Sequence, residues 1–183
     1  MVREQLALQI YEISHLTGSF ELRSGAVSNE YFDKYQFESR PKLLDAIAKN
    51  MQEIILVDFH LLAGLEMGGI PIAVALSLET AKTIVFVRKK SKEYGTRKFA
   101  EGPDINGRIL LIVEDVVTSG GQILHSVEDL RKEGAIITDA VCVIDREAGG
   151  KEKLAEAGIR LHPLFTMSEL KRIWDRRSSV KKY

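Results

Sequence analysis

Short apolar runs and amphipathic stretches alternate along most of the chain. Apolar runs favour buried β-strands, whereas apolar residues spaced three or four apart favour helices. The expected strands are residues 60–63, 83–87, 108–113, 136–144 and 160–165, and the expected helices are residues 70–79, 122–133, 151–157 and a last one that begins at Ser168. Strands that are apolar throughout and alternate with helices indicate an α/β fold, with a mostly parallel sheet flanked by helices. Ligands of such folds bind beyond the carboxyl ends of the strands, so the segments that follow these strands are the candidate site.

Residues 1–40 do not follow this alternation. A first helix is predicted from residues at helical spacing, namely Leu6, Ile10, Ile13 and Leu16, with Gly18 suited to end it. Two extended pieces at residues 20–22 and 30–32 predict a small β substructure. A second helix is predicted from near Ser39 and Pro41, with an apolar face formed by Leu44, Ile47, Met51, Ile54 and Ile55. We therefore expect a single domain over residues 1–183, with a small N-terminal hood built mainly from residues 1–40.

Composition narrows the class of protein. The 183 residues are 45% hydrophobic and 28% charged, which is typical of one globular domain. The single cysteine, Cys142, lies in an apolar run and is expected to be a core side chain. The uncharged stretch at residues 67–78 is too short to span a bilayer, and charges at residues 3 and 4 argue against a signal peptide, so we expect a cytoplasmic protein without a membrane partner. Lys and Arg number 26, as do Asp and Glu, which argues against a general nucleic-acid binder.

Several familiar catalytic and nucleotide-binding motifs are absent from the sequence. It contains no G-x-G-x-x-G or G-x-x-x-x-G-K-[ST] pattern, which removes the main support for a dinucleotide-binding or P-loop protein. It also lacks G-x-S-x-G and H-E-x-x-H, and its four histidines are far apart in sequence. A serine hydrolase triad or a zinc site is therefore unsupported.

The segment EDVVTSGGQ at residues 114–122 carries the clearest chemistry. Its two acids can accept hydrogen bonds from vicinal sugar hydroxyls. Its hydroxyl side chains and the backbone N–H groups at the start of the following helix suit a phosphate, and its glycines allow close approach of the backbone. An ordinary loop that leads into an N-capped helix is the competing interpretation, but the paired acids favour a site for a phosphorylated sugar.

An apolar strand followed by EDVVTSGG resembles the phosphoribosyl pyrophosphate (PRPP) signature of the type I phosphoribosyltransferases. Three further segments, VRKKSKEYGTRKFAEG at residues 87–102, ELRSG at 21–25 and VIDREAGG at 143–150, are similar to those of orotate phosphoribosyltransferases. The resemblance covers most of the chain. It implies the type I phosphoribosyltransferase fold and transfer of phosphoribosyl from PRPP to orotate, which gives orotidine 5′-monophosphate and pyrophosphate in de novo pyrimidine (UMP) biosynthesis.

The resemblance also implies which residues bind PRPP. In this family the basic segment, with six cations and one acid over residues 88–98, is a mobile loop that closes over pyrophosphate, partly from the neighbouring subunit. The implied PRPP-binding residues are Arg88, Lys89, Lys92, Tyr94, Glu114, Asp115, Val116, Val117, Thr118, Ser119, Gly120, Gly121 and Gln122. Lys92 and Asp115 are the implied catalytic residues. A cation such as Lys92 near the departing pyrophosphate stabilises its developing charge. A merely solvated basic hairpin is the alternative for the basic segment.

The implied orotate-binding residues are Arg23, Tyr31, Phe32, Thr118 and Arg146. A guanidinium fork suits a planar substrate with a carboxylate, although Arg146 could instead form a surface salt bridge with Glu147 or another acid. The two aromatic rings could equally pack in the core. Magnesium is implied as the cofactor because PRPP is highly anionic, and no protein residue is assigned as a metal ligand. The family further implies a homodimer with sites shared across its interface.

Glu66-Met67 departs from the enteric branch of the family, which has a Tyr-Lys pair near pyrophosphate at this place. A carboxylate that faced pyrophosphate would repel it, unless Glu66 points away. Two other functions remain open at this stage. One is a phosphoribosyltransferase for another base, such as a purine, and the other is a PRPP-sensing regulator that binds nucleic acid.

Overall fold

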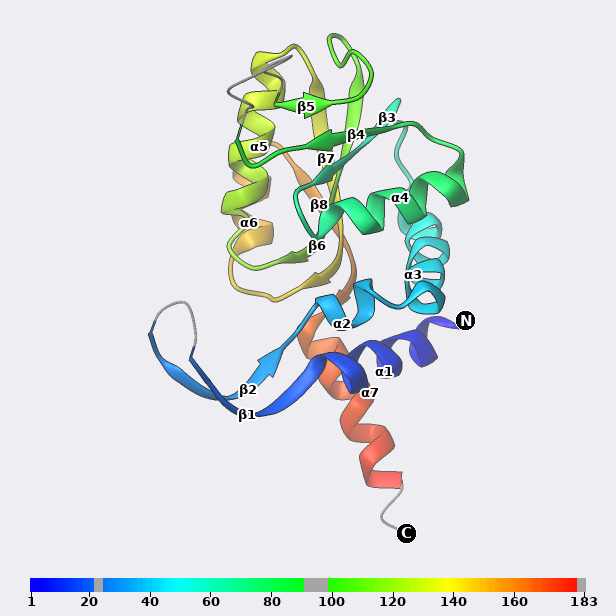
Figure 1. The fold of residues 1–183 in the computed structure, drawn as a ribbon, viewed down its shortest axis with the longest axis vertical. Coiled ribbons are helices and arrows are strands. Elements are labelled where there is room, and N and C mark those ends of the chain that lie inside the picture. The colour runs from blue at the N-terminus through cyan, green and yellow to red at the C-terminus, as the bar shows by residue number, and fades with distance from the viewer. Residues whose placement is uncertain (22–24, 91–98, 181–183) are drawn as a thin grey trace.

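The computed structural model describes residues 1–21, 25–90 and 99–180. A six-stranded sheet forms its centre, in the order β5-β4-β3-β6-β7-β8 (Figure 1). The strands are β3 (Leu61–Leu65), β4 (Ile84–Val87), β5 (Ala100–Glu101), β6 (Ile109–Val117), β7 (Ile136–Asp145) and β8 (Arg160–Thr166). All neighbouring strands are parallel except β4 and β5, which are antiparallel. The predicted α/β fold with a mostly parallel sheet is confirmed, and the two-residue β5 is an addition that the sequence pattern did not predict.

Helices cover both faces of this sheet, with α5 (Gly121–Lys132) and α6 (Gly150–Glu156) on one side and α3 (Pro41–Ile54) and α4 (Gly69–Thr80) on the other (Figure 1). Successive strand residues enter opposite cores, because side chains alternate across a strand. On β6, Leu111 belongs to the core beneath α3 and α4, whereas Leu110 belongs to the core beneath α5. Cys142 is fully buried in the second core, as expected. Among the described residues, none of the helices is long and apolar enough to cross a membrane.

The N-terminal hood consists of α1 (Arg3–Ser14), an antiparallel hairpin of β1 (His15–Glu21) and β2 (Val27–Phe32), and the short helix α2 (Tyr35–Glu38). The hairpin forms a separate two-stranded sheet, and α1 packs beside the last helix, α7 (Met167–Val180). The prediction that the first helix reaches Gly18 is wrong. The helix ends at Ser14 because Leu16 pairs with Tyr31 in the hairpin, so tertiary pairing overrides the helical spacing.

Strand β6 is longer than the sequence predicts. The expected strand ended at residue 113, but the backbone stays paired with β7 as far as Val117, which lies opposite Asp145. Glu114 and Asp115 therefore belong to the strand rather than to the loop that follows it. The longer strand thus brings both acids into the candidate site as strand residues.

Candidate active site

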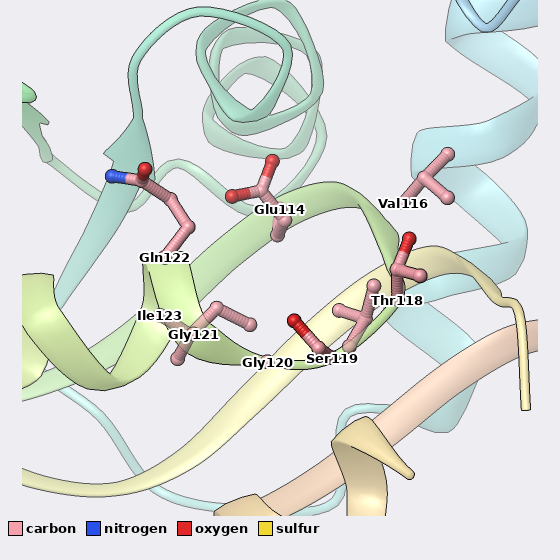
Figure 2. Close-up of a pocket in the computed structure, with 9 residues that line it drawn as sticks. Glu114, Val116, Thr118, Ser119, Gly120, Gly121, Gln122 and Ile123 are labelled. Carbon is pink, nitrogen blue, oxygen red and sulfur yellow. The ribbon is translucent and has the colours of Figure 1, made fainter. Parts of the chain in front are cut away.

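A cavity of about 150 Å³ opens where β6 passes into α5, and we call it the β6–α5 cavity. Its lining residues are Glu114, Val116, Val117, Thr118, Ser119, Gly120, Gly121, Gln122 and Ile123. Figure 2 shows the carboxylate of Glu114, the hydroxyls of Thr118 and Ser119 and the amide of Gln122 around this turn. Of the nine motif residues predicted to bind PRPP, this cavity brings together all except Asp115.

Two glycines allow the turn to pack closely against the start of α6. Gly120 has φ +71°, in the left-handed region that favours glycine, and a Cβ there would lie 3.1 Å from the carbonyl oxygen of Gly150. A Cβ on Gly150 would in turn lie 2.5 Å from the carbonyl oxygen of Thr118. Two of the segments with family resemblance, TSGG and EAGG, are therefore in close backbone contact. The N-terminal amides of α5 remain available to an anion in the cavity, because a helix has no internal partner for its first N–H groups.

Asp115 follows Glu114 on β6, and its backbone N–H donates a 3.1 Å hydrogen bond to Glu114 Oε1. Its side chain has no exposed surface, and its Oδ2 is 2.5 Å from the Nζ of Lys34, which immediately precedes α2. The carboxylate also lies directly over Gly68, at the start of α4, where any Cβ would collide with it. Asp115 does not line the β6–α5 cavity, and its side chain is fully buried.

Burial and hydrogen bonding perturb the pKa values of this acidic cluster. Burial raises the pKa of Glu114 well above its ordinary range. Burial also raises the pKa of Glu38, on α2, to about 9, and a hydrogen bond with Asp115 adds to the shift. For Asp115, burial opposes ionisation, but hydrogen bonds with Glu114, Glu38 and Lys34 outweigh it and lower the pKa. Burial lowers the pKa of Lys34, but the bond to Asp115 and the neighbouring acids raise it overall. At neutral pH the buried centre is thus an Asp115–Lys34 ion pair beside a protonated Glu38.

A second cavity, also of about 150 Å³, lies between the hood and α7, and we call it the hood cavity. It is lined by Tyr11, His15, Ser28, Glu30, Tyr31, Phe32, Arg146, Met167 and Lys171. Three of the five residues predicted to bind orotate, Tyr31, Phe32 and Arg146, therefore meet here. Tyr31 is 46% exposed, so its ring is open to a ligand, whereas Phe32 is half-buried and packs against the core and the ring of Tyr11.

Arg146 follows β7 and connects the two cavities. Its backbone N–H donates a 2.8 Å hydrogen bond to the carbonyl of Val117, which lines the β6–α5 cavity. The neighbouring Glu147 does not form the salt bridge considered as an alternative for Arg146. Its carboxylate instead accepts bonds of 2.8 Å from both the N–H and the hydroxyl of Ser168, at the start of α7. The guanidinium of Arg146 is left exposed beside the aromatic residues of the hood cavity.

The basic segment begins at the carboxyl end of β4 with Arg88 and Lys89. Glu66 points toward this segment, since its Oε2 accepts a 3.0 Å hydrogen bond from the backbone N–H of Lys89. The carboxylate of Glu66 is thus engaged by the backbone. Three predicted site residues, Arg23, Lys92 and Tyr94, lie outside the described residues.

Sequence reasoning missed several side chains of the candidate site. Lys34 and Glu38 are close to Asp115 only because the hood folds back onto the sheet, and no sequence spacing reveals that contact. Lys171 of α7 lines the hood cavity, and no motif in the sequence marked it as a site residue. The described residues include no group of three or more His, Cys, Asp or Glu side chains that could hold a metal ion.

Comparison with known proteins identifies the family. Residues 34–160 match the model of the phosphoribosyl transferase domain. The orotate phosphoribosyltransferase of Nocardioides sp. is 46% identical over 165 residues, which are 90% of this chain and 92% of the relative. That of Methanopyrus kandleri is 38% identical over 182 residues, covering 99% and 98%. The crystal structure of the Mycobacterium tuberculosis orotate phosphoribosyltransferase in complex with Fe(III) dicitrate superposes with a TM-score of 0.83 at 26% identity, over 92% of this chain and 98% of that one. The chain therefore belongs to the phosphoribosyltransferase domain family and, within it, to the orotate phosphoribosyltransferases.

Proposed function

We propose that the protein transfers the phosphoribosyl group of PRPP to orotate and so forms orotidine 5′-monophosphate and pyrophosphate. One observation carries this proposal beyond family membership. The hydrogen bond from the Arg146 N–H to the Val117 carbonyl joins the wall of the β6–α5 cavity to that of the hood cavity. A phosphorylated sugar in the first cavity would thus lie beside a planar carboxylate substrate in the second, which is the juxtaposition that this transfer needs.

In this proposal the β6–α5 cavity holds the 5′-phosphoribosyl part of PRPP. The N-terminal amides of α5 and the hydroxyls of Thr118 and Ser119 bind the 5′-phosphate, because together they present several donors to one anion. Glu114 faces the same cavity and is placed to bind a ribose hydroxyl. Asp115 supports the same strand end from behind, bound to Lys34.

Bond making and breaking occur at the anomeric carbon of the ribose. The N1 atom of orotate gives up its proton to solvent and forms the new bond to C1′, while the bond from C1′ to pyrophosphate breaks with its electron pair leaving on pyrophosphate, through an oxocarbenium-like transition state. Negative charge builds on the departing pyrophosphate, so cations aimed at it lower the barrier. We assign this role to Arg88, Lys89 and Lys92, together with the hydroxyl of Tyr94. The assignment of Lys92 and Tyr94 to this site is based on the sequence alone.

The hood cavity is the proposed orotate site. The guanidinium of Arg146 offers a planar pair of donors to the orotate carboxylate. The exposed ring of Tyr31 can stack on the pyrimidine, with Phe32 behind it. Arg23 and Thr118 complete the proposed orotate-binding set. Thr118 lines the neighbouring cavity and thus stands between the two substrates.

Magnesium is the proposed cofactor. It prefers oxygen ligands and keeps several waters, so it is commonly bound through substrate phosphates rather than by a protein cage. The described residues fit that mode, because they offer no cluster that would hold the ion without a substrate. When bound with PRPP, the ion supplies positive charge to the pyrophosphate group.

The exposed face of α4 supports a homodimer. Ile72 and Leu76 of this helix are fully buried, yet Val74 and Leu78 on its other side are 38% and 83% exposed. Exposed apolar residues four positions apart lie on one helix face and favour contact with another chain. We propose that two copies associate through this face, with the basic segment of each contributing to the site of its partner. A cytoplasmic location stays a prediction.

The fall in orotate ultraviolet absorbance on mixing with PRPP, magnesium and the purified protein tests this function. Hypoxanthine, adenine and uracil serve as parallel substrates, and Arg146→Ala should abolish most of the orotate signal. Arg108→Ala is the matched control, since Arg108 is exposed at the opposite end of β6. Consumption of another base would identify a different phosphoribosyltransferase. PRPP binding without consumption of any base would instead favour the regulator hypothesis.

A further inference from the structure

A polar cluster of two buried acids and a partly exposed lysine connects the hood to the proposed PRPP motif, and Glu38 has no role in the proposed transfer reaction. Its members are Lys34 and Glu38 from the hood and Asp115 from β6. Glu38 is 7% exposed and Asp115 has no exposed surface, so neither carboxyl group is hydrated as a surface acid would be. Buried ionisable groups are costly unless they are paired, which calls for an account of why these three are together.

Local hydrogen bonds fix Lys34 in place. The carboxylate of Asp33 accepts the backbone N–H of Tyr35 at 3.1 Å and the side-chain amide of Gln36 at 3.0 Å, which stabilises the start of α2. The N–H of Asp33 donates a 2.8 Å bond to the carbonyl of Ser14, at the end of α1. Lys34 therefore projects from a turn that is hydrogen-bonded to both α1 and α2.

The Asp115 carboxylate is confined between this lysine and α4. Its Oδ2 lies 2.5 Å from Lys34 Nζ, and the absence of a side chain at Gly68 provides the space that the carboxylate occupies. The same lysine would lie 3.1 Å from a Cβ on Gly68. Asp115 thus has one charged partner, from the hood, and one steric boundary, from the turn that leads into α4.

Glu38 completes the cluster from the next turn of the hood. Among the described residues its buried Oε1 has no donor beside it, and the neighbouring Asp115 carboxylate raises the pKa of Glu38, as expected when two carboxyl groups share one proton. The charged groups that act on it are Asp115, Lys34 and Asp33. The charged side chains of α1 and α3, which pack against α2, are all exposed: Arg3, Glu4, Glu12, Lys42, Asp45, Lys49 and Glu53. The proton on Glu38 therefore serves the contact with Asp115.

We propose that Lys34 and Glu38 are positioning residues for PRPP binding, which hold the Asp115 carboxylate against Gly68 and thereby set the end of β6 on which the β6–α5 cavity is built. Glu38 donates its proton to Asp115, and Lys34 supplies the countercharge. The hood is thus part of the PRPP site as well as the wall of the hood cavity. This inference rests on the proposed function, because PRPP affinity is its readout.

Calorimetric titration with PRPP and magnesium, without orotate, tests the network directly. Glu38→Leu removes the proton donor, and we expect PRPP affinity to fall about 10-fold, within the range that supporting partners of binding groups show. Lys34→Met removes the countercharge, and we expect a loss of about 10- to 100-fold. Glu38→Gln replaces the protonated carboxyl by an amide that still donates, so it should recover most of the affinity lost in Glu38→Leu. The exposed Lys42→Met and Glu53→Leu on α3 are matched controls.

Two further readouts separate positioning from a general loss of structure. The KM for PRPP should rise in Glu38→Leu while the KM for orotate changes little, because Asp115 lies between Glu114 and Val116, which line the β6–α5 cavity. In the wild type, PRPP affinity should decline as the pH rises through about 9, where Glu38 loses its proton, and Glu38→Gln should lack that decline. Circular dichroism before the titration verifies that the Glu38→Leu variant is folded.

The possible outcomes distinguish this inference from the proposed function. If Glu38→Gln and Glu38→Leu bind PRPP equally well, or if Lys34→Met binds like the wild type, the positioning role is refuted while the transferase activity stands. If the wild type neither binds PRPP nor consumes orotate, the proposed function is refuted and this inference is refuted with it. A parallel loss of affinity for both substrates in every variant would refute positioning and indicate a structural role only.

Discussion

Replacing Glu38 by Gln should change how the stability of the folded protein depends on pH. A glutamate in the unfolded chain has its ordinary pKa of 4.5, whereas burial and the bond to Asp115 raise the pKa of Glu38 to about 9 in the folded state. Between these values the folded chain retains a proton that the unfolded chain has released. The stability contributed by this proton is fully present below pH 4.5 and is lost progressively as the pH rises toward 9.

The magnitude follows from linkage and does not depend on the last decimal of the pKa. Within the window each pH unit lowers the free energy of unfolding by about 1.4 kcal/mol, so the loss between pH 6 and 8 is about 2.7 kcal/mol. For a chain of this length that corresponds to roughly 5–11 °C in Tm. The amide introduced by Glu38→Gln carries no titratable proton, so the variant lacks this loss. The lowered pKa of Asp115 and the raised pKa of Lys34 act below and above this pH range, respectively.

Urea unfolding of wild type and Glu38→Gln at pH 6, 7 and 8 measures the effect. The difference in unfolding free energy between the two proteins should grow in favour of the variant with each pH unit, because only the wild type carries the proton of Glu38. Glu53→Gln, at an exposed position on α3, should show no such trend. A difference that stays constant from pH 6 to 8 would refute the claim that Glu38 retains its proton in the folded protein.

Further outcomes are expected for the two cavities, the turn before α5, the basic segment and the exposed face of α4. Arg146→Ala should raise the KM for orotate at least about 10-fold with little change in PRPP affinity in calorimetry, as expected when a charged hydrogen bond is lost. Gly120→Ala should destabilise the protein by about 1–2 kcal/mol in urea unfolding, because φ is +71° and the new Cβ would lie 3.1 Å from the Gly150 carbonyl. Lys92→Ala should lower kcat about 100-fold or more with an unchanged Tm, and equal losses of stability and turnover would contradict its role at pyrophosphate. Leu78→Glu should convert a dimer to a monomer in light scattering; an unchanged mass would exclude the α4 face as the interface.

The central sheet and the β6–α5 cavity could be predicted from the sequence because local patterns determine them. Runs such as the one at residues 109–113 are apolar on both sides, which is possible only for a strand covered by helices on both faces. The turn at Thr118–Gly121 offers a phosphate its own backbone and the start of its own helix, so neighbouring residues make the cavity. The residues that line it are contiguous in the chain, apart from Asp115.

The contacts between distant segments were decided only by the tertiary structure. Pairing with β7 extends β6 through Glu114 and Asp115 as far as Val117, so the two acids lie within the strand rather than in the loop that follows it. The partners of Asp115 come from the hood, and the hood cavity receives Lys171 from α7. Sequence patterns report periodicity within a segment, whereas these contacts depend on how the hood folds back over the sheet. The sequence by itself therefore determined the fold class and the turn between β6 and α5, and long-range packing decided which charges meet beside that turn.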